Sequence, residues 1–403
     1  MRIALIAPQP FIDVRATPME NLRMARLLSD LGHEVEVITY PLGTAPPHPG
    51  VTVRRCPRVP FVKSVGIGFS PAKLLLDISL TFHALNLARQ NHFDCVHGVE
   101  EGAFIGALVG RVIGAPLAYD MDSIISQEIA DSRLKWIPPL VRLAAGIERW
   151  TIRRSVVVIT ISQSMADHVR LIDPRVDVIV APDVPIPPPE GGPDPGRART
   201  QIPPQFASHR LVVYAGSFAG YQGLDMLMSA VPRVTAVCPD AAFVVIGGDE
   251  REIKRLAKAG HAGDMMHKVV FLGKKPPEEI HDFLSAADVL VSPRRRGMNP
   301  PAKIYTYMQS GTPIVATHIP AHRAVLDDDS AILVDASPQG IADGILWAIQ
   351  HPEEAASRAL RAEELVRRIT PELKEAAIRQ AYELLERKVK TSQTRPAGIV
   401  KQQ

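Results

Sequence analysis

Residues 184–196 read Val-Pro-Ile-Pro-Pro-Pro-Glu-Gly-Gly-Pro-Asp-Pro-Gly. Proline removes a backbone donor and glycine weakens regular structure, so this run predicts neither a helix nor a central strand. On both sides of it, short apolar runs alternate with helical patterns. The stretch therefore predicts a linker, residues 185–204, between two separate α/β domains.

Before the linker, apolar runs rich in β-branched residues predict strands that are buried on both faces. Between them, apolar side chains repeat at helical spacing, as at Met24, Leu27, Leu28 and Leu31. This alternation predicts a parallel, doubly wound sheet in residues 1–184. The expected strands are Ile3–Ala7, Val35–Thr39, Val51–Arg54, Cys95–His97, Leu117–Asp120, Val156–Ile161 and Val176–Val180.

After the linker, the same alternation restarts and predicts a second α/β domain over residues 205–370. Residues from about 352 to 389 read as helices, and the polar residues 390–403 read as a disordered tail. The expected strands are Leu211–Ala215, Phe243–Ile246, Val269–Leu272, Val289–Ser292, Ile314–Ala316 and Ile332–Val334.

Composition narrows the class of protein. The net charge of +3 gives no sign of nucleic-acid binding, and no stretch offers the roughly 20 apolar residues that span a bilayer. The three cysteines, Cys56, Cys95 and Cys238, stand far apart and outside any paired metal spacing. The sequence thus predicts a reduced cytoplasmic protein without a metal site or a bound cofactor.

The turn after the first strand of the second domain is built from small residues, from Tyr214 to Leu224. They allow the backbone to approach a ligand, and a helix from about Gly223 would direct its first amides at a phosphate. Glycines also occur in such turns for steric reasons alone, so both interpretations stay open here.

A second candidate runs Val-Ser-Pro-Arg-Arg-Arg-Gly-Met-Asn-Pro-Pro-Ala-Lys over residues 291–303. A strand ends at Ser292, and a helix begins near Pro300 or Pro301, where proline suits the first turn. Three arginines and Lys303 therefore surround a helix N-terminus at the ligand edge of the sheet. A solvated basic loop is the alternative, but this position favours binding of a diphosphate.

Polar residues follow several strand ends of the first domain. The loop after the first strand contains Asp13, Arg15 and Thr17, which we expect to contact an acceptor, although Thr17 could be a helix cap. Glu100 follows another strand, where the helix dipole alone would favour it. Asp122 follows a third, and its carboxylate could take a proton from an acceptor hydroxyl or serve only as a cap.

Residues 54–73 contain five basic and no acidic residues, with apolar side chains between them. Such a segment can dock on an anionic membrane surface, or its apolar residues can be buried instead. The sequence therefore admits a peripheral contact with the cytoplasmic membrane.

Seven segments together resemble the retaining glycosyltransferases of family 4, which have the GT-B fold, over nearly the whole chain. They are Leu-Gly-His-Glu-Val at 31–35, Glu-Arg-Trp at 148–150 with 153–162, Tyr-Ala-Gly-Ser-Phe at 214–218 with Tyr-Gln-Gly-Leu-Asp at 221–225, Val-Val-Phe-Leu-Gly at 269–273, and Lys-Ile-Tyr-Thr-Tyr-Met-Gln-Ser-Gly-Thr-Pro-Ile-Val-Ala-Thr at 303–317.

The resemblance implies two Rossmann-like domains that face each other across a cleft, with a C-terminal helix, residues 371–389, that returns to the first domain. It implies metal-independent transfer of a sugar from a UDP or GDP donor, with retention at the anomeric carbon, to a cell-envelope, glycolipid or polysaccharide acceptor. The residues expected to bind the donor are Gly216, Ser217, Phe218, Gln222, Gly223, Gly273, Arg294, Arg296, Gly297, Asn299, Lys303, Ile304 and Thr306.

The chain departs from the family pattern at several positions. Ser217 and Gln222 stand where the family has an arginine and a lysine, and Met298 and Thr306 stand where it has two glutamates. Asp122 stands where it often has a histidine. Two alternatives therefore remain: a nucleotide-sugar epimerase of the same architecture, and a degenerate module that binds a nucleotide sugar without turnover.

Overall fold

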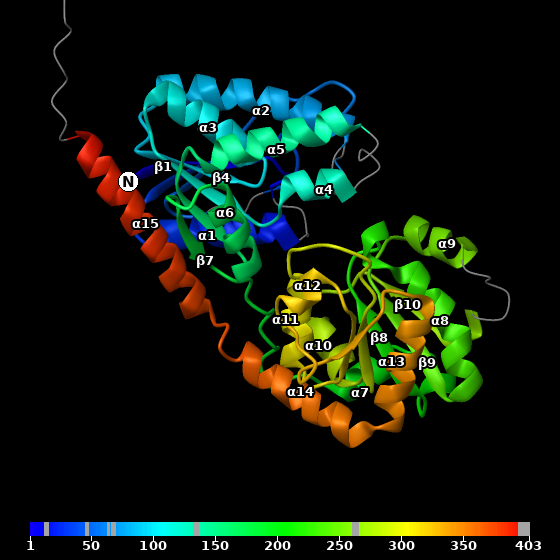
Figure 1. Ribbon diagram of the computed structural model, residues 1–403. Helices are drawn as coiled ribbons and strands as arrows, with labels where there is room; N and C mark the ends of the chain where they lie inside the picture. The colour runs from blue at the N-terminus through cyan, green and yellow to red at the C-terminus, as the bar shows by residue number, and fades with distance from the viewer. Residues whose placement is uncertain are drawn as a thin grey trace, which may run out of the picture. The chain divides into compact units, whose positions relative to one another are not determined.

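The computed structural model describes residues 1–11, 16–44, 48–62, 65, 70–131, 137–259 and 266–393. The chain divides into two compact units (Figure 1): unit 1 comprises residues 1–182 and 372–403, and unit 2 comprises residues 183–371. Both units are parallel α/β sheets covered by helices, so the predicted doubly wound fold is confirmed.

The sheet of unit 1 has the strand order β3-β2-β1-β4-β5-β6-β7, and every pairing is parallel. Its elements are β1 (Arg2–Ala7), α1 (Ala16–Asp30), β2 (Glu34–Thr39), β3 (Val51–Arg55), α2 (Pro71–Gln90), β4 (Cys95–Val99), α3 (Gly102–Ile113), β5 (Leu117–Met121), α4 (Ile125–Asp131), α5 (Pro138–Ile152), β6 (Ser155–Thr160), α6 (Gln163–Ile172), β7 (Asp177–Val180) and α15 (Pro371–Gln393).

The sheet of unit 2 has the order β10-β9-β8-β11-β12-β13, also parallel throughout. Its elements are α7 (Pro195–Thr200), η2 (Pro204–Phe206), β8 (Arg210–Ala215), η3 (Gly220–Gln222), α8 (Leu224–Val237), β9 (Ala241–Ile246), α9 (Glu250–Ala259), η4 (Met266–Lys268), β10 (Val269–Gly273), α10 (Pro277–Ser285), β11 (Val289–Ser292), α11 (Ala302–Gln309), β12 (Ile314–Thr317), α12 (Pro320–Arg323), β13 (Ile332–Val334), α13 (Pro338–Gln350) and α14 (Pro352–Val366).

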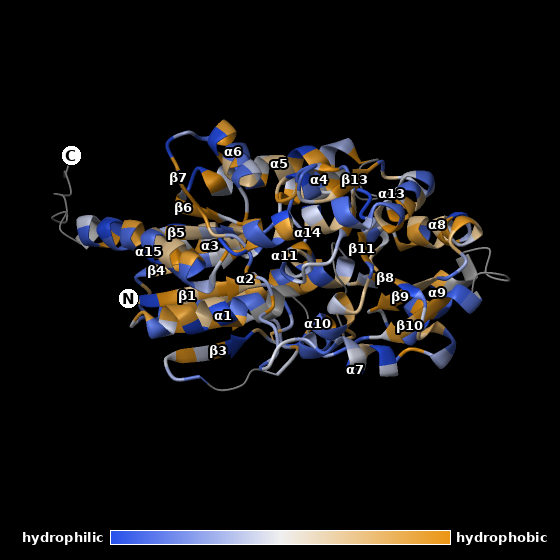
Figure 2. Cartoon of the chain, turned by 90° about the horizontal axis from the view of Figure 1, so that it is seen from below, coloured by the Kyte–Doolittle hydropathy of each residue, from blue (hydrophilic) through white to orange (hydrophobic). Residues whose placement is uncertain are grey.

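Each sheet is buried on both faces. In unit 1, side chains of α1 and α15 pack against one face, and side chains of α2 and α3 pack against the other. In Figure 2 the inner strands, such as β1 and β6, are largely hydrophobic, as strands covered on both sides should be. Because all strands run parallel, their carboxyl ends lie along one edge, where ligands of open α/β sheets bind.

Helix α15 belongs to unit 1, although it follows unit 2 in the sequence. Its side chains Ile378, Ala381, Tyr382 and Leu385 are buried in the same cluster as residues of β1 and α1. Lys374 also forms an ion pair with Glu20 of α1. The predicted return of this helix to the first domain is therefore confirmed, but the helix continues to Gln393 rather than ending near 389. The predicted disordered tail is wrong over 390–393, and residues 394–403 lie outside the described residues.

The linker was expected to contain no helix, and this is wrong over Pro195–Thr200, which form α7. Proline at the first helical position removes only an amide that would have no partner, and the Asp194 carboxylate accepts from the amide of Arg197 at 3.1 Å. Asp282 of α10 then pairs with Arg197 at 2.6 Å, and Ala198 is fully buried. The stretch from 194 to 200 is thus part of unit 2.

Candidate functional site

Glycines line the carboxyl edge of the sheet in unit 2. The amide of Gly216, after β8, donates to Ile246 O at 3.0 Å, and that of Gly247, after β9, donates to Gly273 O at 2.7 Å. A Cβ on Gly247 would lie 1.9 Å from the carbonyl oxygen of Gly216. The ends of β8, β9 and β10 therefore meet backbone to backbone, and a Cβ on Gly273 would meet nothing within 4 Å, so the edge is open there. Sequence reasoning found Gly216 and Gly273 but missed Gly247, although a glycine pair directly after a strand is a usable signal.

The turn from β8 to α8 packs against the loop that follows β11. Gly223 caps α8 in a left-handed conformation (φ 73°), and a Cβ there would lie 1.9 Å from the carbonyl oxygen of Pro293. The amide of Arg295 donates to Tyr221 O at 2.9 Å, and its guanidinium pairs with Asp225 in the first turn of α8. The structure thus brings the two predicted phosphate-binding loops together, with the predicted helix starts confirmed at Leu224 and Ala302.

Lys303 lies where these two loops meet. Its ammonium donates to Gln222 Oε1 at 3.1 Å and lies 4.0 Å from the centre of the Tyr214 ring. An ideal Cβ on Gly216 would be 3.2 Å from the same nitrogen, so the cation stands beside the strand-to-helix turn. Within the described chain, no carboxylate forms an ion pair with it. Burial, and secondly the positive charge of Arg294, hold the pKa of Lys303 well below its ordinary value.

Arg294 is buried and bound to its own loop. Its Nε donates to Arg296 O at 2.9 Å, and its two terminal nitrogens donate to Asn299 O at 3.1 Å and Asn299 Oδ1 at 2.9 Å. The guanidinium also stacks over the Tyr221 ring at 5.1 Å. Sequence reasoning gave Arg294 and Asn299 as direct ligands, whereas most of the arginine's donors shape the loop around Gly297. The side chain of Arg296 is exposed.

A buried histidine, His322, forms hydrogen bonds beside the loop that follows β11. His322 Nδ1 lies 2.7 Å from Thr317 O and must donate to it, so Nε2 accepts from the Ser292 hydroxyl at 2.9 Å. Burial lowers the pKa of His322 to about 3, so the ring is neutral. The Thr317 hydroxyl in turn bonds to Arg294 O. Sequence reasoning missed His322, because nothing in the local sequence shows that it lies against the ends of β11 and β12.

Several side chains that were predicted to contact the nucleotide sugar are buried in unit 2 and do not face the open edge of its sheet. Phe218 is buried against Phe271 and the backbone of Gly248. Ile304 is fully buried in the core, and the Thr306 hydroxyl is buried and accepts from the amide of Ile186 at 3.3 Å. The sequence could not distinguish these core positions from ligand contacts, because both occur in the same motifs. Ser217, in contrast, is exposed.

In unit 1, the polar residues after β4 and β5 lie together. Glu100 precedes α3 with a positive φ of 53°, and its amide donates to Asp120 O at 2.9 Å. The Ser123 hydroxyl donates to the Glu100 carboxylate at 2.8 Å, and Asp122, half-buried, is the residue before it. A non-glycine residue in this conformation is strained, which is frequent at functional sites. Glu100 lies two residues before α3 begins at Gly102, so it is not part of the first helical turn.

Other predicted acceptor contacts remain untested. Asp13 and Arg15 lie outside the described residues, as does the side chain of Thr17. The backbone of Thr17 lies inside α1, which begins at Ala16, so the alternative role as a helix cap is wrong. Sequence reasoning also missed a buried chain in which His97 contacts Tyr382 Oη at 2.9 Å and Asp120 Oδ2 at 3.4 Å.

The basic segment 54–73 is largely occupied by internal contacts. Arg54 pairs with Glu36 at 3.2 Å, and Lys73 pairs with Glu101. The Arg55 guanidinium donates to three carbonyl oxygens, those of Tyr40, Leu42 and Phe11. These three cations therefore already have partners within the chain. Residues 63–64 and 66–69 lie outside the described residues.

Two absences bear on the chemistry, both stated for the described residues alone. No group of three or more His, Cys, Asp and Glu side chains is placed to hold a metal ion. No helix there combines the length and apolarity that crossing a membrane requires.

Two families match the two units. Residues 209–351 match the family described as glycosyl transferases group 1, and residues 21–183 match the glycosyl transferase 4-like domain. The chain is 25% identical over 399 residues to a phosphatidyl-myo-inositol mannosyltransferase of Mycolicibacterium smegmatis, across 95% of this chain and 94% of that protein. It is 29% identical over 313 residues to the 2-deoxystreptamine N-acetyl-D-glucosaminyltransferase of Streptomyces fradiae, across 71% and 70% of the two chains.

Solved structures share the fold at low sequence identity. Sucrose-phosphate synthase from Thermosynechococcus elongatus superposes with a TM-score of 0.75 at 17% identity, across 96% of this chain and 99% of that chain. WaaG, a glycosyltransferase of lipopolysaccharide biosynthesis, gives a TM-score of 0.70 at 15% identity, across 95% and 99%. Anabaena HepE in complex with UDP-glucose gives 0.68 at 16% identity, across 96% and 100%.

Proposed function

The chain belongs to the family 4 glycosyltransferases with the GT-B fold, and from that premise we propose that unit 2 binds a nucleotide-diphosphate sugar and that the sugar is transferred to a hydroxyl of a cell-envelope acceptor. The observation that carries the donor assignment is Lys303, a half-buried cation with no carboxylate partner within the described chain. A buried charge without a counter-ion costs stability, and a diphosphate supplies the missing anion.

The surroundings of Lys303 support binding of a diphosphate. No side chain caps the N-terminus of α8, and its helix dipole favours a negative charge at that end. An ideal Cβ on Gly273 would meet nothing within 4 Å, so a ligand can approach the backbone of the sheet edge there. As the bond to the sugar breaks, negative charge grows on the leaving diphosphate, and fixed donors at this place stabilise that charge.

We propose that the protein cations take the part of a metal ion and that the anomeric configuration is retained, as the family resemblance implies. Under this mechanism the sugar leaves and is captured on the same face of its ring. Asp122 and Glu100 follow strand ends of unit 1 and are the carboxylates expected to orient the acceptor hydroxyl. These roles stay predictions.

The names of the curated relatives point to a class of acceptor. The two curated relatives named above carry the names of an inositol lipid and of 2-deoxystreptamine, both of which contain a polyhydroxylated six-membered ring. We therefore expect a ring hydroxyl of that kind, presented on a lipid or a polysaccharide, and a cytoplasmic location with peripheral contact at the membrane. HepE, a different protein, was solved in complex with UDP. For this chain, both UDP and GDP donors are to be tested.

The test is a screen of UDP-, GDP-, ADP- and dTDP-sugars with the purified chain in excess chelator, with phosphatidylinositol, an aminocyclitol or a membrane-lipid extract as acceptor. We expect metal-free binding of one nucleotide, and release of the free nucleotide only when an acceptor is present. NMR of the product then reports the anomeric configuration. Turnover of the donor without an acceptor would indicate the epimerase, and binding without turnover would indicate the degenerate module. Dependence on an added divalent cation would contradict the metal-independent mechanism.

The lowered pKa of Lys303 predicts how donor affinity depends on pH. A bound diphosphate raises this pKa, so the complex holds more protons than the free protein between the two pKa values. Donor affinity should therefore fall as pH rises through that window, and binding should take up protons there. Calorimetry in buffers of different ionisation enthalpy measures this uptake. An uptake that persists in Lys303→Met would show that another group titrates.

A further inference from the structure

We propose that the carboxyl end of α5 and the start of β6 form a binding site for the phosphate of an anionic phospholipid, built from Arg149, Arg153, Arg154 and Trp150. This site is separate from the donor edge in unit 2, and the inference rests on the proposed function only through the lipid nature of the acceptor. The first observation is an open hollow of about 540 Å³ lined by these four side chains and Gly146.

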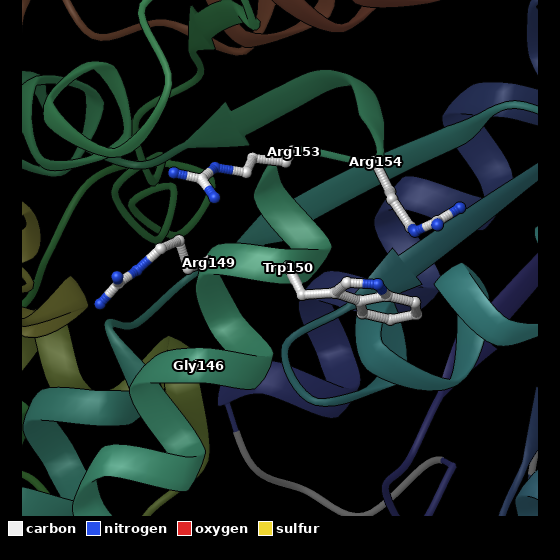
Figure 3. A pocket seen from close by; sticks show the side chains of 5 residues that line it. All are labelled: Gly146, Arg149, Trp150, Arg153 and Arg154. Carbon is white, nitrogen blue, oxygen red and sulfur yellow. The ribbon is translucent and has the colours of Figure 1, made fainter.

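Figure 3 shows how these side chains are arranged. Arg149 and Arg153 extend to the same side, as expected for residues one helical turn apart. The Arg154 guanidinium lies over the Trp150 ring at 5.0 Å on the other side. All three arginines are exposed, and the ring of Trp150 packs partly against the core. Arginine forks match phosphate oxygens, and an anchored tryptophan suits the boundary between an apolar and an aqueous phase.

The three arginines have no ion-pair partner within the described chain. Two acidic side chains close to them in the sequence or in the electrostatics are already engaged. Glu148 accepts from the amide and hydroxyl of Ser126 at 3.0 and 2.9 Å and contacts His168 at 3.2 Å. Asp173, whose pKa is lowered chiefly by Arg175 and weakly by Arg153, binds Arg175 through both oxygens. Two like charges four residues apart on one helix repel, so folding alone does not favour this pair.

The helix dipole explains only part of the positive charge at the carboxyl end of α5. The carboxyl end of α5 favours cations in its last turn. It does not explain why helices α2, α3 and α5 together carry so few acidic residues. Helices α2, α3 and α5 pack in sequence along one side of the sheet, as Figure 1 shows. Their only carboxylates are Asp77, which accepts from the Tyr40 hydroxyl, and the buried Glu148.

The same layer exposes apolar side chains. Residues of α2, α3 and α5 that would ordinarily be buried stand in solvent, and Phe82 is 71% exposed. A surface that combines exposed apolar residues, unpaired arginines and no exposed acid is complementary to an anionic bilayer rather than to a soluble anion. The exposed apolar residues are Leu74, Leu75, Ile78, Phe82, Leu108, Val112 and Leu143.

The test compares a charge-removed variant with a matched control. Arg149→Gln, Arg153→Gln and Arg154→Gln are combined in one chain, and the control combines Arg251→Gln, Lys254→Gln and Arg255→Gln, three exposed cations of α9 in unit 2. Sedimentation with mixed phosphatidylglycerol and phosphatidylcholine vesicles measures binding. Each cation near an anionic surface is worth about fivefold, so we expect the first variant to bind on the order of 100-fold more weakly and the control to bind as the unmodified chain does.

A second readout locates the contact. In a chain whose other tryptophans, Trp136 and Trp347, are replaced by phenylalanine, vesicles that contain brominated lipid should quench the emission of Trp150. Two results would overturn the proposal: native-like vesicle binding by the Arg149/Arg153/Arg154 variant, or competition by inorganic phosphate beyond that of chloride at equal ionic strength, which would indicate a site for a soluble anion. Donor binding in buffer without vesicles should be unchanged in this variant. If the unmodified chain binds no nucleotide sugar, the proposed function fails while the vesicle result still stands.

Discussion

Replacement of Lys303 by methionine is expected to lower kcat/KM for sugar transfer by about 10²–10³-fold, the usual effect of removing one preorganised donor from a developing anion. The same change should leave the unfolding temperature unchanged or raise it. The native ammonium is half-buried beside Arg294 without a carboxylate, so its removal relieves desolvation and repulsion, and methionine keeps most of the apolar contact with Tyr214.

The prediction is specific because activity should fall while stability should not. A residue that only stabilises the fold would lose activity and stability together. Lys254→Met, which removes an exposed cation from α9 of the same unit, is the control and should change neither quantity measurably. Steady-state kinetics and thermal unfolding on the same preparations decide the question. A fall in unfolding temperature with unchanged nucleotide affinity would show that Lys303 is structural.

Gly223→Ala is expected to destabilise unit 2 and to abolish donor binding. A non-glycine residue in the left-handed conformation costs about 1–2 kcal/mol, and the new methyl group would lie 1.9 Å from the carbonyl oxygen of Pro293. The two loops that meet at Lys303 must then separate. With a total cost above about 2 kcal/mol, the unfolding temperature should fall by about 5 °C or more for a unit of this size.

The chain offers a matched control three residues earlier. A Cβ on Gly220 would meet nothing within 4 Å, and its φ lies outside the left-handed region. Gly220→Ala should therefore keep the unfolding temperature and the nucleotide affinity close to those of the unmodified chain. Calorimetry and nucleotide titration on both variants test the pair. Equal behaviour of the two variants would show that the contact between Gly223 and Pro293 does not hold the loops together.

Most of the fold could be predicted from the sequence, because its signals are local. Continuous apolar runs such as Leu211–Ala215 give buried parallel strands, and Gly223 and Pro301 mark helix starts through their own backbone preferences. The helix at Pro195–Thr200 was missed, although its signals are also local. Proline was read as excluding helix, whereas at the first position it fits, and Asp194 completes the cap.

The site was predicted less completely, because charge in a sequence does not identify its partner. Arg294 and Lys303 stand nine residues apart in one motif, yet one is bound to Asn299 and the other has no counter-ion within the described chain. For the same reason, the sequence did not show which cations of the basic segment 54–73 have partners within the chain. The partners of its cations, such as Glu36 and Glu101, lie far away in the sequence.

The position of α15 has a consequence for how the protein is made. Unit 2 is contiguous, so all of its residues have been synthesised once residue 371 has emerged from the ribosome. Synthesis of unit 1 begins first, but its core lacks Ile378, Tyr382 and Leu385 until the end of translation. His97 likewise has no contact with the Tyr382 hydroxyl until then. Unit 1 begins at the first residue of the chain, yet its fold can be completed only after all of unit 2 has been synthesised. The apolar side chains that α15 covers stay exposed while unit 2 folds, and a chain truncated before α15 leaves them exposed.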